Sequence, residues 1–347
     1  MSKHTVIDFL SRNESHLNFN LTFLKGLEGL NDDVCLIANQ TQVRRLEAAN
    51  IVSFKDSLKW KKRSFNGFLK LLKHRTSRIT ILAADNYLVP ILLFLFFPFF
   101  RKSKITFVLH NNVRPLSFNT KKRIPLKLVS KVLNVKLICL TEDGLEEVQK
   151  IGFKKQAVLI PHFNFSHFSK DKFDPGVKLQ ADKSNILLIG RQADIFVSKI
   201  LPLINLNDYS NLHFIICSSK ATQTQYENLQ IITNRLSNNE FNTYLELTDF
   251  VLFPNHNVRF RASGILLDCI SKCCPVIAPK EGHFKEYCGE SIGQFYNSID
   301  GLKNILDEVN SKQLKRSAYP STNFKMALEK SSFESFTKEI IKNYSNI

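Results

Sequence analysis

Short apolar runs alternate with amphipathic stretches along most of the chain. In the first half, strands are expected at 5–10, 34–38, 79–83, 105–109, 135–140 and 158–160, and helices at 16–30, 42–49 and 142–151. Nearly continuous apolar runs are typical of parallel strands that are buried on both faces. Strands that alternate with helices predict a parallel sheet with helices on each side.

The region 163–184 interrupts this alternation with polar residues and a Pro175-Gly176 turn, as expected of a connection between domains. After it, strands are expected at 185–189, 213–217, 229–232, 250–253 and 275–278, and helices at 196–204, 238–247 and 264–272. The pattern predicts an α/β protein with two doubly wound, Rossmann-like domains. We assign 1–167 to the N-terminal domain, 168–184 to the linker and 185–347 to the C-terminal domain. The last helix is a candidate to pack back on the N-terminal domain.

The composition agrees with two globular domains but adds a strong positive charge. The chain has 347 residues, of which 44% are hydrophobic and 23% charged, with a net charge of +17. The Lys and Arg residues cluster in the first half, around 59–63, 101–104 and 121–131. Such an excess attracts nucleic acid, anionic membranes or phosphorylated substrates, unless it is only a solvated basic face. Binding of single-stranded nucleic acid would call for aromatic residues interleaved with the cations on a sheet face. These clusters instead surround predicted helices, so we expect no nucleic acid partner.

The segment Tyr87–Phe100 is apolar all round and contains two prolines. A membrane-spanning helix needs about 20 residues, so this segment is too short to span. Apolar area followed directly by cations is typical of an interfacial anchor on an anionic membrane; the alternative is a fully buried helix. The residues expected at the membrane are Phe94, Phe96, Phe97, Phe99, Phe100, Arg101 and Lys102. With no export signal before Ser11, the sequence predicts a cytoplasmic protein, attached peripherally to the inner membrane face if the anchor exists.

The seven cysteines do not form a metal motif. Most lie in apolar runs, as expected of reduced core thiols. The one cluster, Cys269, Cys273, Cys274 and Cys288, lacks the paired spacing of a zinc knuckle. We therefore expect no metal.

The clearest candidate site is the stretch from Arg261 to Asp268, which reads as a loop of small residues followed by a helix. Ser263 and Gly264 place backbone N–H groups at the helix start, where phosphate binds. Asp268 follows Gly264 by one turn and can hold ribose hydroxyls. The alternative is that Ser263 merely caps the helix while Asp268 faces solvent. Asn255, Arg261 and Ile265 are further candidates for donor contacts.

Two further signals follow predicted strands. Gly190 allows close approach of a ligand after the strand 185–189, and Arg191 and Lys199 supply cations for a leaving diphosphate. An exposed helix lysine is the alternative for Lys199. His110 ends the strand 105–109 and can hydrogen-bond a sugar or transfer a proton, although a lone histidine is more often structural.

The order of these elements resembles the group-1, family 4-like retaining glycosyltransferases with the GT-B fold. The matching segments are Gly190-Arg191, Asp249–Pro254, Leu266–Asp268, Cys273–Ala278, Gly282–Glu286, Phe107–Asn111, Leu140–Glu142 and Leu159–His162. The resemblance covers roughly Thr5 to Tyr296.

The resemblance implies two Rossmann-like domains facing across a cleft, and transfer of a sugar from a UDP- or GDP-sugar to a glycan or lipid-linked acceptor. It implies donor binding in the C-terminal domain and acceptor binding in the N-terminal domain, with no metal or cofactor. Arg191 and Lys199 would contact the diphosphate and Asp268 the ribose, while His110 would face the transferred sugar. Phe260 stands where the family carries an acidic residue, and Ser11–Glu14 replaces its glycine-rich loop. A catalytically inactive scaffold is therefore the main alternative, ahead of a nucleic-acid-binding protein.

Overall fold

The computed structural model describes residues 3–10, 17–30, 33–47, 54–58, 63–110, 112–163, 173–174, 176–177, 179–218, 226–234, 236–254, 259–260, 262–289 and 291–345. The chain divides into two compact units. The first unit comprises Met1–Phe163, Phe260–Ala262 and Ser332–Ile347, and the second comprises Asn164–Arg259 and Ser263–Ser331.

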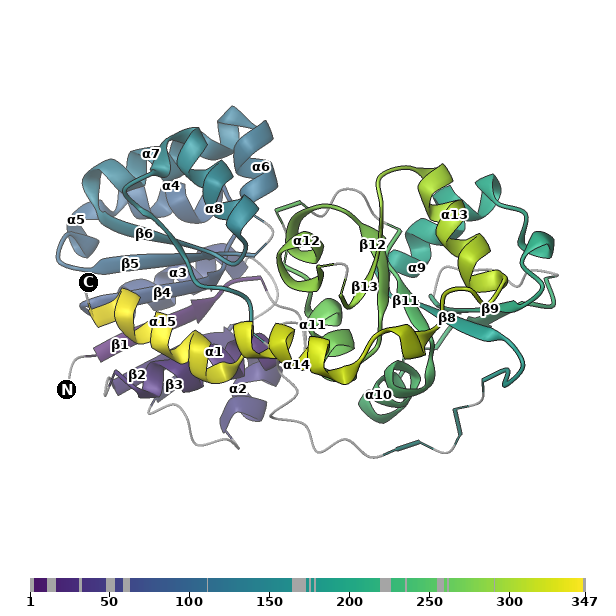
Figure 1. Cartoon of the computed structure of the whole chain (residues 1–347). Coiled ribbons are helices and arrows are strands. Elements are labelled where there is room, and N and C mark those ends of the chain that lie inside the picture. The colour runs from purple at the N-terminus through teal and green to yellow at the C-terminus, as the bar shows by residue number, and fades with distance from the viewer. Residues whose placement is uncertain are drawn as a thin grey trace. The chain divides into compact units, whose positions relative to one another are not determined.

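The first unit is built on a parallel sheet of seven described strands in the order β3-β2-β1-β4-β5-β6-β7. The strands are β1 Lys3–Asp8, β2 Asp33–Asn39, β3 Phe54–Leu58, β4 Arg78–Ala83, β5 Lys104–Leu109, β6 Asn134–Cys139 and β7 Ala157–Leu159. Its helices are α1 Leu17–Glu28, α2 Gln40–Glu47, α3 Arg63–Lys73, α4 Leu88–Leu95, α5 Phe97–Phe100, α6 Val113–Phe118, α7 Thr120–Val132, α8 Glu142–Val148 and α15 Phe333–Ser345. Helices α4, α6, α7 and α8 cover one face of the sheet, and α1 and α15 lie on the other (Figure 1).

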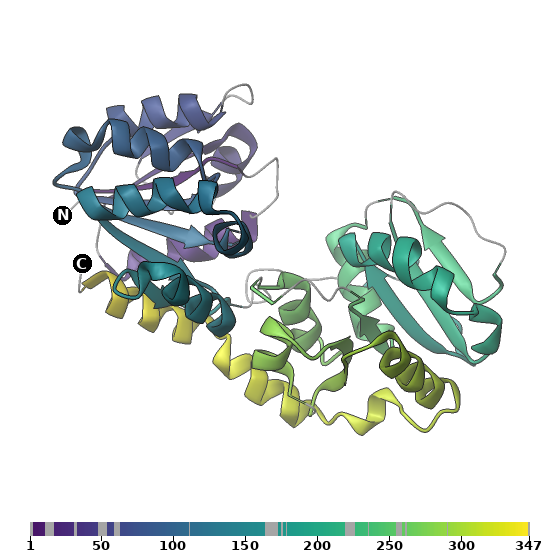
Figure 2. The ribbon, with the colours of Figure 1, turned by 90° about the horizontal axis from the view of Figure 1, so that it is seen from above.

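The C-terminal helix α15 is part of the first unit's core (yellow in Figures 1 and 2). Phe336 packs on Phe163, with ring centres 4.0 Å apart, and on Phe23 of α1. Tyr344 is almost fully buried and shares a 2.9 Å hydrogen bond with Thr80 of β4. Burial also raises the pKa of the Tyr344 hydroxyl, which therefore stays protonated. These contacts tie the end of the chain to the central strands of the first sheet.

The second unit repeats the architecture with six described strands in the order β10-β9-β8-β11-β12-β13. The strands are β8 Ser184–Ile189, β9 Leu212–Cys217, β10 Leu229–Ile232, β11 Phe250–Leu252, β12 Val276–Pro279 and β13 Gly293–Tyr296. The helices are α9 Arg191–Ile195, α10 Asn238–Leu247, α11 Gly264–Ser271, α12 Gly282–Cys288, α13 Ile299–Asn310 and α14 Ser321–Lys330. The predicted α/β class with two doubly wound sheets is confirmed, because all observed strand pairs are parallel.

The apolar segment 87–100 forms two short helices instead of one. Helix α4 ends at Leu95, and α5 begins at Phe97 with Pro98 in its first turn. Proline fits there because the first turn has no intrahelical acceptor for its missing N–H. None of the helices in the described ranges combines the length and apolarity needed to cross a membrane.

Candidate functional site

Gly190 follows β8 at the carboxyl edge of the second sheet, where ligands bind in doubly wound folds. Its φ angle is +60°, a left-handed conformation that favours glycine. A Cβ atom at this position would meet no atom of the described residues within 4 Å, so they leave the space beside this backbone open. Arg191 is the next residue and opens α9. The backbone at Gly190 therefore leaves room for a ligand to approach closely, and such an approach stays a prediction.

Helix α9 is fixed at this edge by its own polar contacts. The Ser218 hydroxyl, at the end of β9, donates to the Asp194 carboxylate, and the Asp194 N–H donates to the Gly190 carbonyl over 3.3 Å. Lys199 lies in the following helical turn, Phe196–Ile200, and is exposed. It comes more than two helical turns after Arg191, so the two cations do not share one turn.

Helix α11 begins at the same edge, after β11. The Ser263 hydroxyl accepts a 3.3 Å hydrogen bond from the Leu266 N–H, so Ser263 caps the helix as its alternative role predicted. The Ser263 N–H donates to Nδ1 of His283 over 2.9 Å. The prediction that this N–H faces a diphosphate therefore needs correction. The N–H groups of Gly264 and Ile265 belong to the first turn, which has no intrahelical acceptors, and they remain the candidate donors for an anion.

His283 is a site residue that sequence reasoning missed. It is fully buried in α12, with its ring centre 4.5 Å from that of Tyr287. The preceding Gly282 has φ +55°, and a Cβ there would lie 2.6 Å from the Arg259 carbonyl oxygen. The start of α12 thus packs closely against the backbone of Arg259 and Ser263, at and before the α11 cap. No local pattern marks this role, because His283 and Ser263 are twenty residues apart.

Asp268 is half-buried on α11, one turn after Gly264. Its neighbours Leu267 and Cys269 are buried in the core of the second unit, so Asp268 lies at the margin of the buried face. Asn255 and Arg261, also predicted to contact the donor, lie outside the described residues.

The ends of β8 and β11 lie side by side, because these strands are paired in the sheet. Gly190 directly follows β8, and α11 begins twelve residues after the end of β11, on the same carboxyl edge of the sheet. His110 belongs to the other unit, where it follows β5.

The His110 ring is positioned by α1. Phe19 meets it edge-on, with ring centres 4.1 Å apart, and Phe19 also stacks on Phe163. His110 is half-buried at the carboxyl edge of the first sheet. Asn112, close by in the chain, donates to the Ala84 carbonyl over 2.9 Å and links the ends of β5 and β4.

A buried polar group at the end of β1 was also missed. The Asn20 side chain donates to Asp8 over 2.7 Å and to Gln42 over 2.8 Å. All three side chains are buried. The Leu10 N–H donates to Asp8 over 3.0 Å, and residues 11–16 that follow lie outside the described residues.

The predicted membrane segment has a mixed surface. Leu95, Phe96, Phe97 and Phe99 are exposed by 64%, 37%, 38% and 56%, and we call these four residues the apolar tip. Arg101 and Lys102 are exposed beside it, and Phe94 is half-buried. Phe100 is the exception: it is fully buried against Phe68, so its predicted contact with lipid is wrong.

Five of the seven cysteines are buried core residues, and Cys35 and Cys273 are partly buried. Burial raises the pKa of the Cys274 thiol to about 11 and keeps it protonated. Within the described ranges, no group of three or more His, Cys, Asp or Glu side chains is placed to hold a metal ion. That no metal is needed stays a prediction.

Solved structures share this architecture along the whole chain. HepE from Anabaena in complex with UDP has a TM-score of 0.73 and 12% identity, over 99% of this chain and 100% of HepE. Sucrose-phosphate synthase from Thermosynechococcus elongatus has a TM-score of 0.72 and 11% identity, over 99% of each chain. The chain has the GT-B fold. A glycosyltransferase from Rickettsia africae follows with a TM-score of 0.67 and 12% identity, over 100% of this chain and 99% of that one.

No family model matches the sequence, and no curated protein matches it. At such identities the structural similarity establishes the GT-B fold alone. The chemistry is argued from the residues of this chain.

Proposed function

We propose that this GT-B protein transfers a sugar from a UDP- or GDP-sugar to a glycan or lipid-linked acceptor in polysaccharide or glycoconjugate assembly. The observation that carries the proposal is the capped start of α11 at the carboxyl edge of the second sheet, with Asp268 one turn along. The complex of HepE with UDP supports the assignment of a nucleotide donor.

The donor would lie on the second unit. The N–H groups of Gly264 and Ile265 would bind the diphosphate, helped by the positive end of the α11 dipole. Asp268 would accept hydrogen bonds from the ribose hydroxyls. Asn255 and Arg261 would add contacts near the same helix start.

In the transfer, the bond between the anomeric carbon and the diphosphate oxygen breaks, and the oxygen keeps the electron pair. Arg191 and Lys199 would neutralise the negative charge that develops there, a role that needs no metal. The acceptor hydroxyl forms the new bond to the anomeric carbon and gives up its proton to the departing diphosphate or to solvent. His110 would contact the transferred sugar from the first unit, which would bind the acceptor. The family resemblance favours retention at the anomeric carbon.

We also propose peripheral attachment to the inner face of an anionic membrane through the apolar tip. Apolar side chains exposed beside Arg101 and Lys102 have the composition of an interfacial anchor. A lipid-linked acceptor would be reached from such a surface.

The test is the release of nucleoside diphosphate from a panel of UDP- and GDP-sugars, with and without lipid-phosphate acceptors and with excess chelator. We expect one donor to be turned over, with activity that persists in chelator. If a folded protein binds a donor but releases no nucleoside diphosphate, the inactive scaffold replaces the enzyme. Phe260, in the place of an acidic residue, is the observation that favours that outcome.

A further inference from the structure

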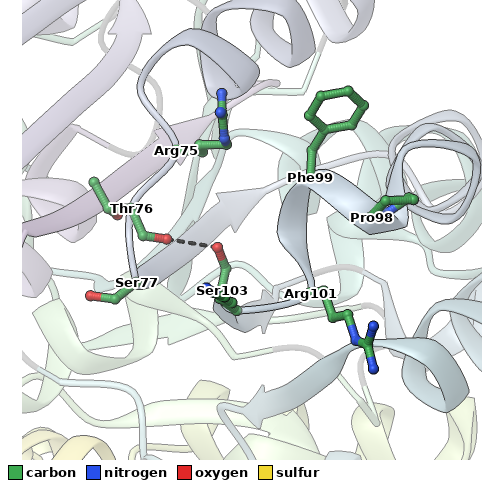
Figure 3. A pocket seen from close by; sticks show the side chains of 8 residues that line it. Arg75, Thr76, Ser77, Pro98, Phe99, Arg101 and Ser103 are labelled. Atoms are coloured by element: carbon green, nitrogen blue, oxygen red, sulfur yellow. Dashed lines mark hydrogen bonds between the residues drawn. The ribbon is translucent and has the colours of Figure 1, made fainter.

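A pocket of about 420 Å³ lies where β4 and β5 begin. Arg75 and Thr76 line it from the segment before β4, and Phe99, Arg101, Lys102 and Ser103 line it from α5 and the segment before β5. Figure 3 shows Arg75 and Phe99 on one side of this pocket and Arg101 on the other. The chain brings together two segments that are about 25 residues apart in sequence.

Backbone contacts hold the two walls together. The Ser103 hydroxyl donates to the Thr76 carbonyl over 2.7 Å (Figure 3), and the Lys104 N–H donates to the Ser77 carbonyl over 2.8 Å. The Thr76 hydroxyl in turn bonds to Thr5 of β1 over 3.1 Å. The floor of the pocket is therefore part of the sheet edge and is preformed.

The pocket is cationic. Arg75, Arg101 and Lys102 line it, and none of the described residues that line it is acidic. The Arg75 guanidinium lies 5.9 Å from the Phe99 ring centre and donates to the Leu72 carbonyl over 2.8 Å. Arg75 and Arg101 flank the pocket from opposite sides, and three cations together with lining serine and threonine residues favour a phosphate group.

The pocket is separate from the proposed reaction site. Helix α5 lies at the end of the sheet where β4 and β5 begin (Figure 1), whereas His110 follows the other end of β5. The six residues of β5 span about 20 Å. A ligand in the pocket would not contact His110.

Phe99 belongs both to the pocket wall and to the apolar tip. We propose that the pocket binds the phosphate of an anionic phospholipid headgroup while the apolar tip enters the acyl boundary beside it. A free phosphate would use the cations but not the tip, whereas a phospholipid uses both. This inference rests on the membrane contact proposed above and gives it a defined ligand site.

The test is flotation of the full chain with vesicles of phosphatidylcholine alone and with added phosphatidylglycerol. The variant Arg75→Gln with Arg101→Gln removes two charges from the pocket. The variant Lys122→Gln with Lys131→Gln removes two exposed charges from α7, outside the pocket, and is the matched control. We expect the pocket variant to lose about 30-fold in affinity for anionic vesicles and the control to lose much less. Nucleoside diphosphate release without lipid should be unchanged in both.

Each outcome separates the hypotheses. Equal losses of vesicle affinity in the two variants would indicate diffuse electrostatic attraction. That result would overturn phospholipid binding in the pocket but not the membrane contact. A wild-type protein that floats with neither vesicle would overturn both, while sugar transfer remains measurable by itself. Calorimetry with glycerol 3-phosphate is the third arm. Suppose that glycerol 3-phosphate binds only when both arginines are present, while the pocket variant binds vesicles as the wild type does. The pocket ligand would then be a soluble phosphate, and the phospholipid assignment would be wrong.

Discussion

The two units have the same architecture but differ in their surfaces. Of the seventeen large hydrophobic side chains exposed in the described part of the chain, twelve lie on or next to α3–α7 of the first unit. They are Phe65, Leu69, Tyr87, Leu88, Leu95, Phe96, Phe97, Phe99, Phe118, Ile124, Leu128 and Val132. In the second unit, by contrast, the exposed ones are scattered, and single exposed apolar residues need no explanation. In both units, burial in a parallel sheet requires apolar side chains in the core. The outward faces of the helices carry no such requirement, so their composition can differ between the units.

The difference extends to charge. Helix α7 carries Lys121, Lys122, Arg123, Lys127 and Lys131 among its exposed apolar positions. The second unit instead presents its candidate chemistry at strand ends, around Gly190 and the start of α11. The first unit thus combines an apolar and basic layer with one candidate residue for sugar contact, and the second unit carries the proposed donor site.

The largest expected effect tests the second unit. Replacing Arg191 by Ala should lower turnover about 10²–10³-fold, because a fixed cation is lost where the leaving diphosphate gains charge. Donor affinity should fall less. Steady-state rates and donor titrations measure the two quantities. Lys199→Ala is the companion variant, and we expect a smaller loss because Lys199 is exposed beyond the first turn. A turnover that survives both substitutions would remove the cationic mechanism.

The next effect concerns Asp268. Its replacement by Asn should weaken donor binding by about 1.5–3 kcal/mol, the contribution of a hydrogen bond to a charged group. Calorimetry with the nucleoside diphosphate measures it. Asp300→Asn, at an exposed position on α13 in the same unit, is the control. Unchanged affinity for Asp268→Asn would return this side chain to a surface role.

A smaller effect compares the surfaces of the two units directly. Phe97→Ser with Phe99→Ser should weaken binding to anionic vesicles by about 1–3 kcal/mol, because two half-exposed rings lose their apolar area. Met326→Ser, on α14 of the second unit with 58% exposure, should leave vesicle binding unchanged. Flotation gives both values, and equal behaviour of the two variants would contradict a specialised first unit.

The smallest effect is a pH dependence of the second unit's stability. Burial, and secondarily Lys183, lowers the pKa of His213, which shares a 2.9 Å hydrogen bond with Asn185. The folded state therefore disfavours the charged imidazole. The unfolded chain binds the proton more readily, so the free energy of unfolding decreases as the pH falls below about 6.5. The free energy of unfolding, measured between pH 5 and 8, should depend less on pH in His213→Gln than in the wild type. Parallel profiles of the two proteins would show that His213 does not contribute to the pH dependence of stability.

Local signals explain what the sequence predicted well. Helix α10 runs over Asn238–Leu247 as expected, and its start carries a reciprocal pair of hydrogen bonds between Ser237 and Glu240. The central strands were recognised because they are buried on both faces. Strand β3 was missed because Phe54–Leu58 is a polar edge strand without a continuous apolar run.

Long-range contacts explain the rest. The bond from Ser263 to His283, the burial of Tyr344 and the joining of Arg75 to the segment after α5 all depend on how distant segments meet. Composition likewise marked the whole of 94–100 as apolar, yet Phe100 is fully buried while Phe96, which also packs against Phe68, is 37% exposed. Spacing along the chain carries no information on such pairs.

The length of β5 has a consequence for any lipid that this protein meets. The cationic pocket lies before its first residue and His110 after its last, about 20 Å apart. A molecule would have to span that distance to occupy both places at once. A phospholipid headgroup bound at Arg75 and Arg101, as proposed, would therefore attach the protein to the membrane without reacting at His110. Under the proposed function, a lipid-linked acceptor would therefore be a second molecule, distinct from the lipid bound in the pocket.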